Sequence, residues 1–268
     1  MDTLDTIVIP AEFKWWAKMG YSARGVIYLV IGGLGVMAAS GSHGEITDSK
    51  GAILAIVEQP FGYALLVLLV IGLFGYSLWR FIQAIRDTDD HGKSPKGLAI
   101  RVALFGSGVT HALLAVWAIA LLDGLDDSSS GAPGILSSDL AQIAFLLTGG
   151  VCITAGLAHF YKGWNAGFDK YMSLPPNTQF WARPVCRFGL VARGVVWCMV
   201  GWFFIDSAMK AQADEIKGID EALSTLQQSS HGPWLLLIVA SGLFAFGIYS
   251  CLEAVYRRIN VGAIPNGK

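Results

Sequence analysis

Charged side chains are scarce in this chain of 268 residues. Lys, Arg, Asp and Glu together make up 15% of it, hydrophobic residues make up 54%, and the mean hydropathy is +0.53. Soluble globular domains ordinarily carry about 25% charged residues. The shortage of charge therefore excludes an ordinary soluble protein and predicts a membrane protein.

Cysteine is also rare, with four residues at Cys152, Cys186, Cys198 and Cys251. Three of them fall inside apolar segments and none lies in a loop expected outside the cell, so no structural disulfide is expected. The sequence also lacks a nucleotide-binding loop, a Cys/His cluster with metal-ligand spacing and a nucleophile elbow. We therefore expect no enzymatic activity, no metal and no cofactor.

Long apolar runs, by contrast, are plentiful. An α-helix rises about 1.5 Å per residue, so about 20 apolar residues cross a hydrocarbon core of roughly 30 Å. The pattern predicts spans at about residues 19–39, 62–83, 101–122, 140–161, 188–208 and 233–254. The expected fold class is an all-α membrane protein, a single domain with six transmembrane helices.

The first apolar run recurs twice along the chain. Moving it forward by 83 positions and by 169 positions brings Gly25 onto Gly108 and then onto Gly194. This predicts three tandem helical hairpins with pseudo-threefold symmetry, at about residues 14–86, 97–169 and 183–258. The 32 glycines suit helices whose backbones approach closely in lipid.

Two short amphipathic helices are expected outside the membrane. The run at residues 51–59, GAILAIVEQ, aligns 170 positions on with residues 221–229, EALSTLQQS. In and just before the second run, the side chains of Ile219, Ala222, Leu223 and Leu226 fall on one helical face. Two roles stay open for these helices in repeats 1 and 3: a lid on the hairpin or a gate for a solute.

The charge distribution predicts the orientation. Sixteen of the nineteen Lys and Arg residues lie at the two termini and near the loops that follow the second and fourth spans. Twelve of the twenty acidic residues lie in the other loops. The positive-inside rule then places both termini in the cytoplasm, in a multi-pass protein of the bacterial inner membrane.

A layer of polar side chains is expected near the cytoplasmic ends of the spans. Ionisable groups inside a span face protein or water, because lipid does not solvate them. Arg193 and Glu253 are the opposite charges available within one hairpin, so they are expected to pair. The layer either fixes helix register or forms an anion or lipid-headgroup site. Its candidate members are Arg24, Arg80, Gln83, Lys162, Asn165, Arg193 and Glu253.

Tyr28, His111 and Trp197 occupy equivalent positions near the middle of the first, third and fifth spans. If these spans surround a pseudo-threefold axis, the three side chains meet there. This axial cluster is either hydrogen-bonded packing or a proton relay or ligand contact. A haem bound by His111 and His159 is not expected, since the two lie at levels roughly 10 Å apart at 1.5 Å per residue.

Four stretches carry a resemblance to a known family: GYSARGVIY, GAILAIVEQPFG, GLFGYSLWR and GLFAFGIYSCLEAVYRRI. They resemble the bacterial membrane family called domain of unknown function 1206, whose members carry three two-span units. The middle repeat departs from the pattern, because Ser107 replaces the arginine and the external run is missing. The resemblance implies an integral inner-membrane protein and no established activity.

These observations predict a non-enzymatic scaffold or accessory subunit of a membrane complex. The alternative is a small-solute, proton or ion pathway along the pseudo-threefold axis. The expected partners are membrane lipids, including anionic headgroups on the cytoplasmic side, and another membrane protein. Nucleic acid is not expected, because the basic excess is explained by topology and anionic lipid.

The orientation can be tested by chemical labelling. A single cysteine at Ser42 should react with an impermeant thiol reagent in intact cells, because the predicted topology places it outside. A single cysteine at Ser94 should stay unlabelled. The reverse pattern would invert the topology.

Overall fold

The computed structural model describes residues 13–42, 44–122, 138–209 and 219–259. Its six long helices contain stretches long and apolar enough to cross a membrane, as predicted. This confirms an all-α membrane fold with six candidate spans. The helices are α1 (Phe13–Ala39), α3 (Gly62–Arg86), α4 (Pro95–Leu122), α5 (Ser138–Trp164), α6 (Pro176–Met209) and α8 (Gly232–Tyr256).

Two spans begin well before the predicted boundary. Helix α1 starts at Phe13, so the aromatic and basic stretch before the apolar run is helical as well. Helix α6 starts at Pro176, so much of the connection predicted for residues 162–187 is helical. A proline fits the first turn of a helix, whose N–H groups have no intrahelical partner. Pro184 lies within α6 but before its apolar run.

The short helices α2 (Ser49–Val57) and α7 (Ile219–Gln227) form where the sequence predicts them. Asp48 caps α2 by accepting hydrogen bonds from the backbone N–H groups of Lys50 and Gly51 at 2.9 and 3.0 Å. Helix α2 packs between α1 and α3, and α7 packs between α6 and α8. Each therefore fills the space between the two helices of its own repeat.

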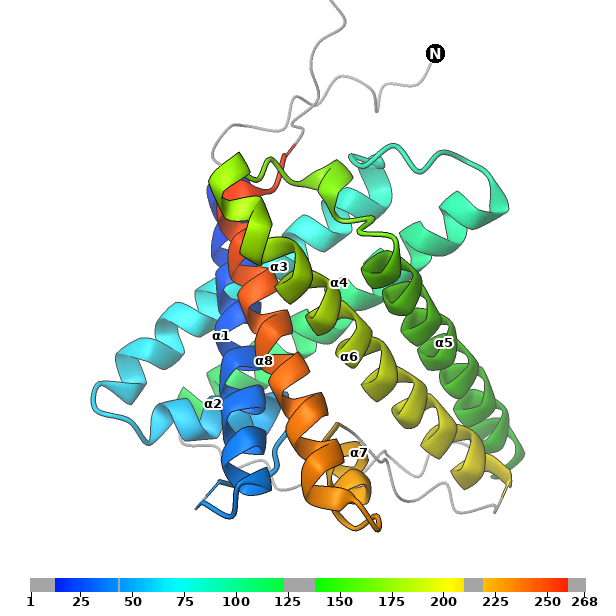
Figure 1. Cartoon of the computed structure of the whole chain (residues 1–268). Helices are drawn as coiled ribbons and strands as arrows, with labels where there is room; N and C mark the ends of the chain where they lie inside the picture. Colours follow the sequence, from blue (N-terminus) through cyan, green and yellow to red (C-terminus); the bar gives the residue numbers. More distant parts are fainter. Residues whose placement is uncertain (1–12, 43, 123–137, 210–218, 260–268) are drawn as a thin grey trace, which may run out of the picture.

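The closest helix pairs join different repeats. Helix α1 packs most extensively against α8, α5 against α6, and α3 against α4, whereas α1–α3 and α6–α8 contacts are less extensive. In Figure 1, α5 and α6 lean away from α1 and α8 toward the lower right. The first helix of each repeat thus lies beside the second helix of another repeat. The pseudo-threefold symmetry stays a prediction.

Repeat-equivalent glycines explain this pairing. A Cβ atom on Gly25 would lie 2.5 Å from Sγ of Cys251 in α8, and one on Gly108 would lie 2.8 Å from the Phe81 ring in α3. A Cβ atom on Gly194 would lie 2.8 Å from the Gly156 carbonyl oxygen in α5. The glycine stripe is therefore the surface through which the helix pairs pack closely, as the sequence predicts.

The middle repeat differs from the other two. Within the described ranges, α4 and α5 do not pack extensively against each other, so the predicted hairpin between them is not seen. Only about a sixth of each apolar window (17%) is buried, compared with 44–56% in the other four spans. The bundle is therefore open between α4 and α5, on the side where the sequence departs from the repeat.

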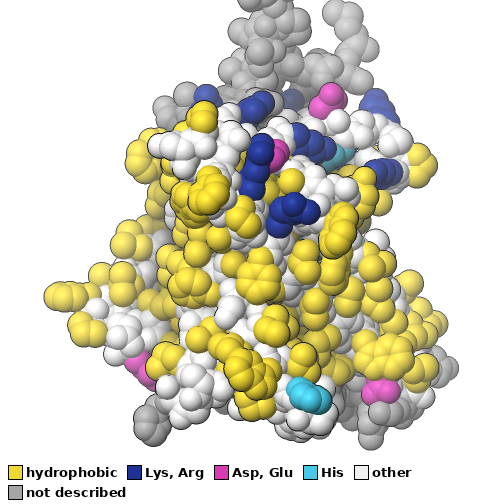
Figure 2. Space-filling model, viewed as in Figure 1, with side chains coloured by type: hydrophobic (Ala, Val, Ile, Leu, Met, Phe, Trp, Pro, Cys, Tyr) yellow, Lys and Arg dark blue, Asp and Glu magenta, His cyan; other side chains and the backbone are white. Residues whose placement is uncertain are grey.

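The surface divides into two zones along the length of the bundle. In Figure 2, Lys and Arg side chains gather toward the end of the bundle where α1 begins, and hydrophobic side chains cover most of the rest of that face. We call this end the terminal end, because α1 begins there and α8 finishes there. The apolar belt suits lipid contact, and the terminal end carries the site described next.

Candidate functional site

All six long helices surround a cavity of about 230 Å³ near the terminal end. Below we call it the basic cavity. Its apolar side chains form one part of the wall, and charged and aromatic side chains form the rest. It is lined by Arg24, Arg80, Asp89, His91, Ile100, Leu104, His159, Lys162, Tyr171, Leu190, Phe246, Tyr249, Glu253 and Arg257.

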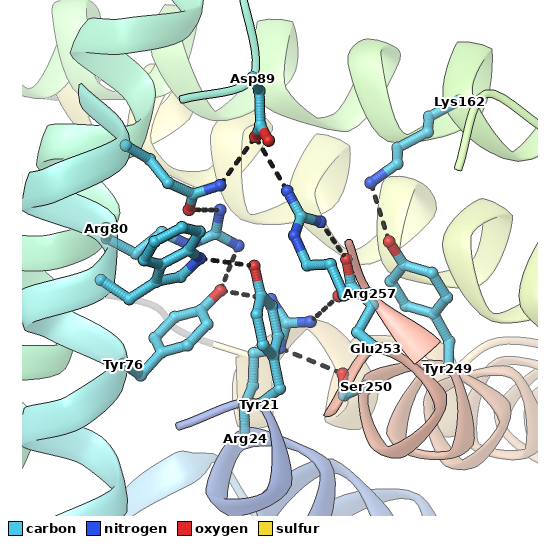
Figure 3. A network of polar contacts seen from close by, with 12 residues as sticks. Tyr21, Arg24, Tyr76, Arg80, Asp89, Lys162, Tyr249, Ser250, Glu253 and Arg257 are labelled. Atoms are coloured by element: carbon cyan, nitrogen blue, oxygen red, sulfur yellow. Dashed lines mark hydrogen bonds and ion pairs between the residues drawn. The ribbon is translucent and has the colours of Figure 1, made fainter. Parts of the chain in front are cut away.

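Glu253 is the centre of the polar network drawn in Figure 3, and its side chain is 2% exposed. One carboxylate oxygen accepts from Nη2 of Arg24 at 2.5 Å, and the other accepts from Nη1 of Arg257 at 2.7 Å. The ion pair between Arg24 and Glu253 joins α1 to α8. A carboxylate held by two guanidinium groups stays ionised despite its burial.

Arg24 uses all three guanidinium nitrogens. Besides Glu253, it donates to Oγ of Ser250 at 3.1 Å and to the hydroxyl of Tyr76. The same hydroxyl also accepts from Arg80, which donates in addition to Oε1 of Gln83 at 2.9 Å. Tyr76 therefore connects the arginines of α1 and α3.

A short loop after α3 brings a second carboxylate over the cavity. Asp87 accepts from the backbone N–H groups of His91 and Gly92 at 2.8 and 2.7 Å. Burial opposes the charge of Asp87, but these two bonds keep its pKa below the ordinary value. The loop places Asp89, which accepts from Gln83 at 2.7 Å and from Arg257 at 2.9 Å.

The cavity has more cationic than anionic side chains. Four lining residues are Lys or Arg, and two are carboxylates. Lys162 donates to the Tyr249 hydroxyl at 2.8 Å rather than to a carboxylate. Burial disfavours the charge of Arg257, yet Tyr21, Glu253 and Asp89 raise its pKa well above the ordinary value. The cavity is therefore a buried site of net positive charge.

The predicted pairing of Arg193 with Glu253 is wrong. Glu253 pairs instead with Arg24, because α8 packs against α1 through the glycine stripe. Helix α6 packs against α5, whose neighbouring polar residues are His159 and Lys162 and include no carboxylate. Arg193 consequently lies among aromatic rings, 4.4 Å from the Phe246 centroid and 4.5 Å from that of Tyr28.

Five other members of the predicted polar layer lie around the basic cavity: Arg24, Arg80, Gln83, Lys162 and Glu253. Asn165 does not join them. It is exposed, and it lies just after α5, where its side chain donates to the Tyr161 carbonyl of that helix at 3.1 Å. Five of the seven candidates thus gather around one cavity.

The predicted axial cluster is divided between two places. Tyr28 and Trp197 both lie beside Arg193, whose Cζ is 4.5 and 5.7 Å from their ring centroids. His111 lies instead against Tyr76, with ring centroids 4.5 Å apart, and its Nδ1 is hydrogen-bonded to the Ser107 carbonyl at 2.8 Å. The role of these three residues as a ligand or proton site stays a prediction.

Sequence reasoning missed several residues of the network. Tyr21, Tyr76 and Tyr249 sit among hydrophobic neighbours in the sequence and read as core or interface aromatics. Asp89 and Arg257 lie in polar stretches that read as solvated. The one available signal was position, since each lies within two turns of a predicted polar-layer residue.

The described portion of the chain contains no set of side chains arranged to bind a metal ion. No group of three or more His, Cys, Asp and Glu side chains there is placed to hold a metal ion. The four cysteines are free. The cavity offers hydrogen bonding and charge from guanidinium, ammonium, carboxylate, imidazole and phenol groups.

Comparison with known proteins places the chain in a family of unknown function. The family model described as Domain of Unknown Function (DUF1206) matches residues 19–87 and 188–257, which are the first and third repeats. The chain is 32% identical over 265 residues to "Uncharacterized protein YxxB" of Bacillus subtilis (strain 168), covering 94% of this chain and 95% of the relative. No solved structure matches.

Glu253→Gln should destabilise the protein, because two buried guanidinium groups lose their shared counter-charge. Breaking a buried ion pair typically costs about 3–5 kcal/mol. Unfolding in a neutral detergent would measure the loss against Asp169→Asn. That control breaks the Arg183–Asp169 pair, whose side chains are 49% and 33% exposed, and should cost less than about 1 kcal/mol. Equal losses in the two variants would contradict the central role given to Glu253.

Proposed function

The chain belongs to the family of Domain of Unknown Function (DUF1206). We propose that it is a non-enzymatic membrane protein that binds an anionic group in the basic cavity. The group is a phosphate or a carboxylate. It belongs either to a lipid headgroup or to a small solute. The observation that carries the proposal is the unbalanced positive charge buried in the cavity.

The charge imbalance is energetically significant because the groups are buried. Arg24 and Arg257 are 5% and 8% exposed and pair with the two carboxylates. Arg80 and Lys162 are half-buried and have no carboxylate partner among the described residues. Taking an ion out of water costs several kcal/mol unless an opposite charge and hydrogen bonds replace its hydration. Glu253 and Asp89 do this for part of the set only. A bound anion would supply the missing negative charge.

Unused hydrogen-bond donors support the same proposal. Nε of Arg80 and Nε of Arg257 are buried and have no acceptor among the described residues, and both side chains line the cavity. A buried donor without a partner costs about 1–3 kcal/mol, more when it is charged. Oxyanions carry several acceptor oxygens, and guanidinium groups bind phosphate and carboxylate through paired N–H donors.

The proposed place of the site is the cytoplasmic half of the bacterial inner membrane. This follows from the orientation predicted by the positive-inside rule, with both termini in the cytoplasm. Basic pockets between helices on that side suit anionic lipid headgroups. A free anion entering the same cavity would be the first step of the solute pathway predicted as an alternative.

A scaffold or accessory role is the second candidate, and the opening between α4 and α5 favours it. These helices are far less buried than the other four spans. A helix of a partner membrane protein would fit between them. Co-purification of one defined partner in mild detergent, lost when bulky side chains are placed on the facing surfaces, would support this role.

Anions should stabilise the purified protein. A ligand at 100 times its Kd adds about 2.7 kcal/mol, which raises the melting temperature by roughly 5–10 °C in a protein of this size. We expect this response to inorganic phosphate or to short-chain phosphatidylglycerol, compared with chloride at equal ionic strength and with phosphatidylcholine of the same chain length. A response to phosphatidylglycerol alone would identify a headgroup, and a response to phosphate would identify a free anion.

Variants locate the response. Lys162→Gln should abolish most of it, because Lys162 lines the cavity and has no carboxylate partner. Lys170→Gln should keep it, because Lys170 is an exposed lysine in the nearby 3-10 helix at Asp169–Tyr171. No response to either ligand, or an equal response in both variants, would overturn the proposal.

A further inference from the structure

Arg193 is a buried cation without an acceptor. Its side chain is in α6, and the residue is 9% exposed. Its Nε and Nη1 atoms are buried and have no hydrogen-bond partner in the described part of the chain. Arg24, its repeat equivalent, satisfies all three nitrogens. The two equivalent arginines therefore differ in their hydrogen bonding: Arg24 has an acceptor for each nitrogen, and Arg193 lacks acceptors for two of them among the described residues.

Aromatic rings surround Arg193. Its Cζ lies 4.5 Å from the Tyr28 centroid, 4.4 Å from that of Phe246 and 5.7 Å from that of Trp197. The faces of such rings attract a cation, which stabilises the charge. They are poor substitutes for hydrogen-bond acceptors, so the N–H groups remain unsatisfied.

Arg193 is next to the basic cavity. Phe246 and Leu190 line that cavity, and Leu190 lies one helical turn before Arg193 in α6. The Phe246 centroid is 5.2 Å from Cζ of Arg24 and 4.4 Å from Cζ of Arg193. The two guanidinium groups therefore approach the same ring, one belonging to the cavity and the other lying outside its lining.

We propose that Arg193 is a second anion subsite, which makes the cavity specific for ligands that carry two anionic groups. The inference rests on the proposed function for its ligand class. One group binds at Arg80, Lys162 and Arg257. The other displaces the Phe246 ring from Arg193 and accepts hydrogen bonds from Nε and Nη1. The compounds that fit are diphosphates, dicarboxylates and lipids with two phosphates.

The middle repeat explains why the subsite is on this side. Arg24 receives a carboxylate from α8, whereas Arg193 lies among rings of α1, α6 and α8, and the adjacent helix α5 offers no carboxylate at that level. A permanent acidic partner would block the subsite, as Glu253 does at Arg24. A ligand that supplies its own negative charge is the acceptor that the chain itself does not provide.

The test compares inorganic phosphate with diphosphate, by calorimetry on the full-length protein in neutral detergent at constant ionic strength. We expect Arg193→Gln to weaken diphosphate binding by roughly tenfold or more, the size of losing hydrogen bonds to a charged group. The affinity for phosphate should change less than about twofold in this variant, because phosphate binds at the first subsite and does not contact Arg193. Lys162→Gln should weaken both ligands, and Lys170→Gln should weaken neither.

Two further measurements separate the possible failures. Without ligand, the melting temperature of Arg193→Gln should stay close to that of the wild type. The described residues give Arg193 no hydrogen bond or ion pair to lose, and removal of a buried charge offsets the lost ring contacts. If the glutamine variant does not fold, Arg193→Lys keeps the charge without the planar fork and should give an intermediate loss of diphosphate affinity. Absence of binding of both phosphate and short-chain phosphatidylglycerol in the wild type would defeat the proposed function. Normal phosphate binding with no selective loss in Arg193→Gln would defeat this inference alone.

Discussion

The structure depends on one buried carboxylate held between two helices. Glu253 accepts from Arg24 of α1 and from Arg257 just beyond α8, and Arg257 in turn holds Asp89 of the loop after α3. This chain of charges connects the first repeat to the third at the terminal end. It also determines the shape of the cavity, because the same side chains form its wall. One carboxylate thus serves both packing and binding.

Glycine packing decides which charges meet. Gly25 and Gly32 bring α1 against α8, with Cβ positions that would lie 2.5 Å from Cys251 Sγ and 2.3 Å from Phe244 N. That contact places Arg24, one residue before Gly25, beside Glu253. The equivalent contact of α6 with α5 brings Arg193 to a helix without a carboxylate at that level. Equivalent arginines consequently have different surroundings: Arg24 pairs with a carboxylate, and Arg193 lies among aromatic rings.

The sequence was sufficient for the spans and for the glycine surfaces, because both depend on local pattern. The length of an apolar run predicts a span directly. Gly25, Gly108 and Gly194 are recognised because they recur at equivalent positions of the repeat. The local pattern does not predict which helix packs against each glycine surface. A shared hairpin predicts that Glu253 pairs with Arg193, and only the packing of α1 on α8 shows that Glu253 pairs with Arg24. Asp89 and Arg257 look solvated until the loop and the chain after α8 fold over the cavity.

Diffraction from crystals grown with selenate would test the binding of an anion most directly. Data collected at the selenium absorption edge would locate this tetrahedral oxyanion by its anomalous scattering. The account predicts a peak inside the basic cavity, within hydrogen-bond distance of Arg80, Lys162 or Arg257. A map with selenium peaks on the surface of the protein and none in the basic cavity would contradict it.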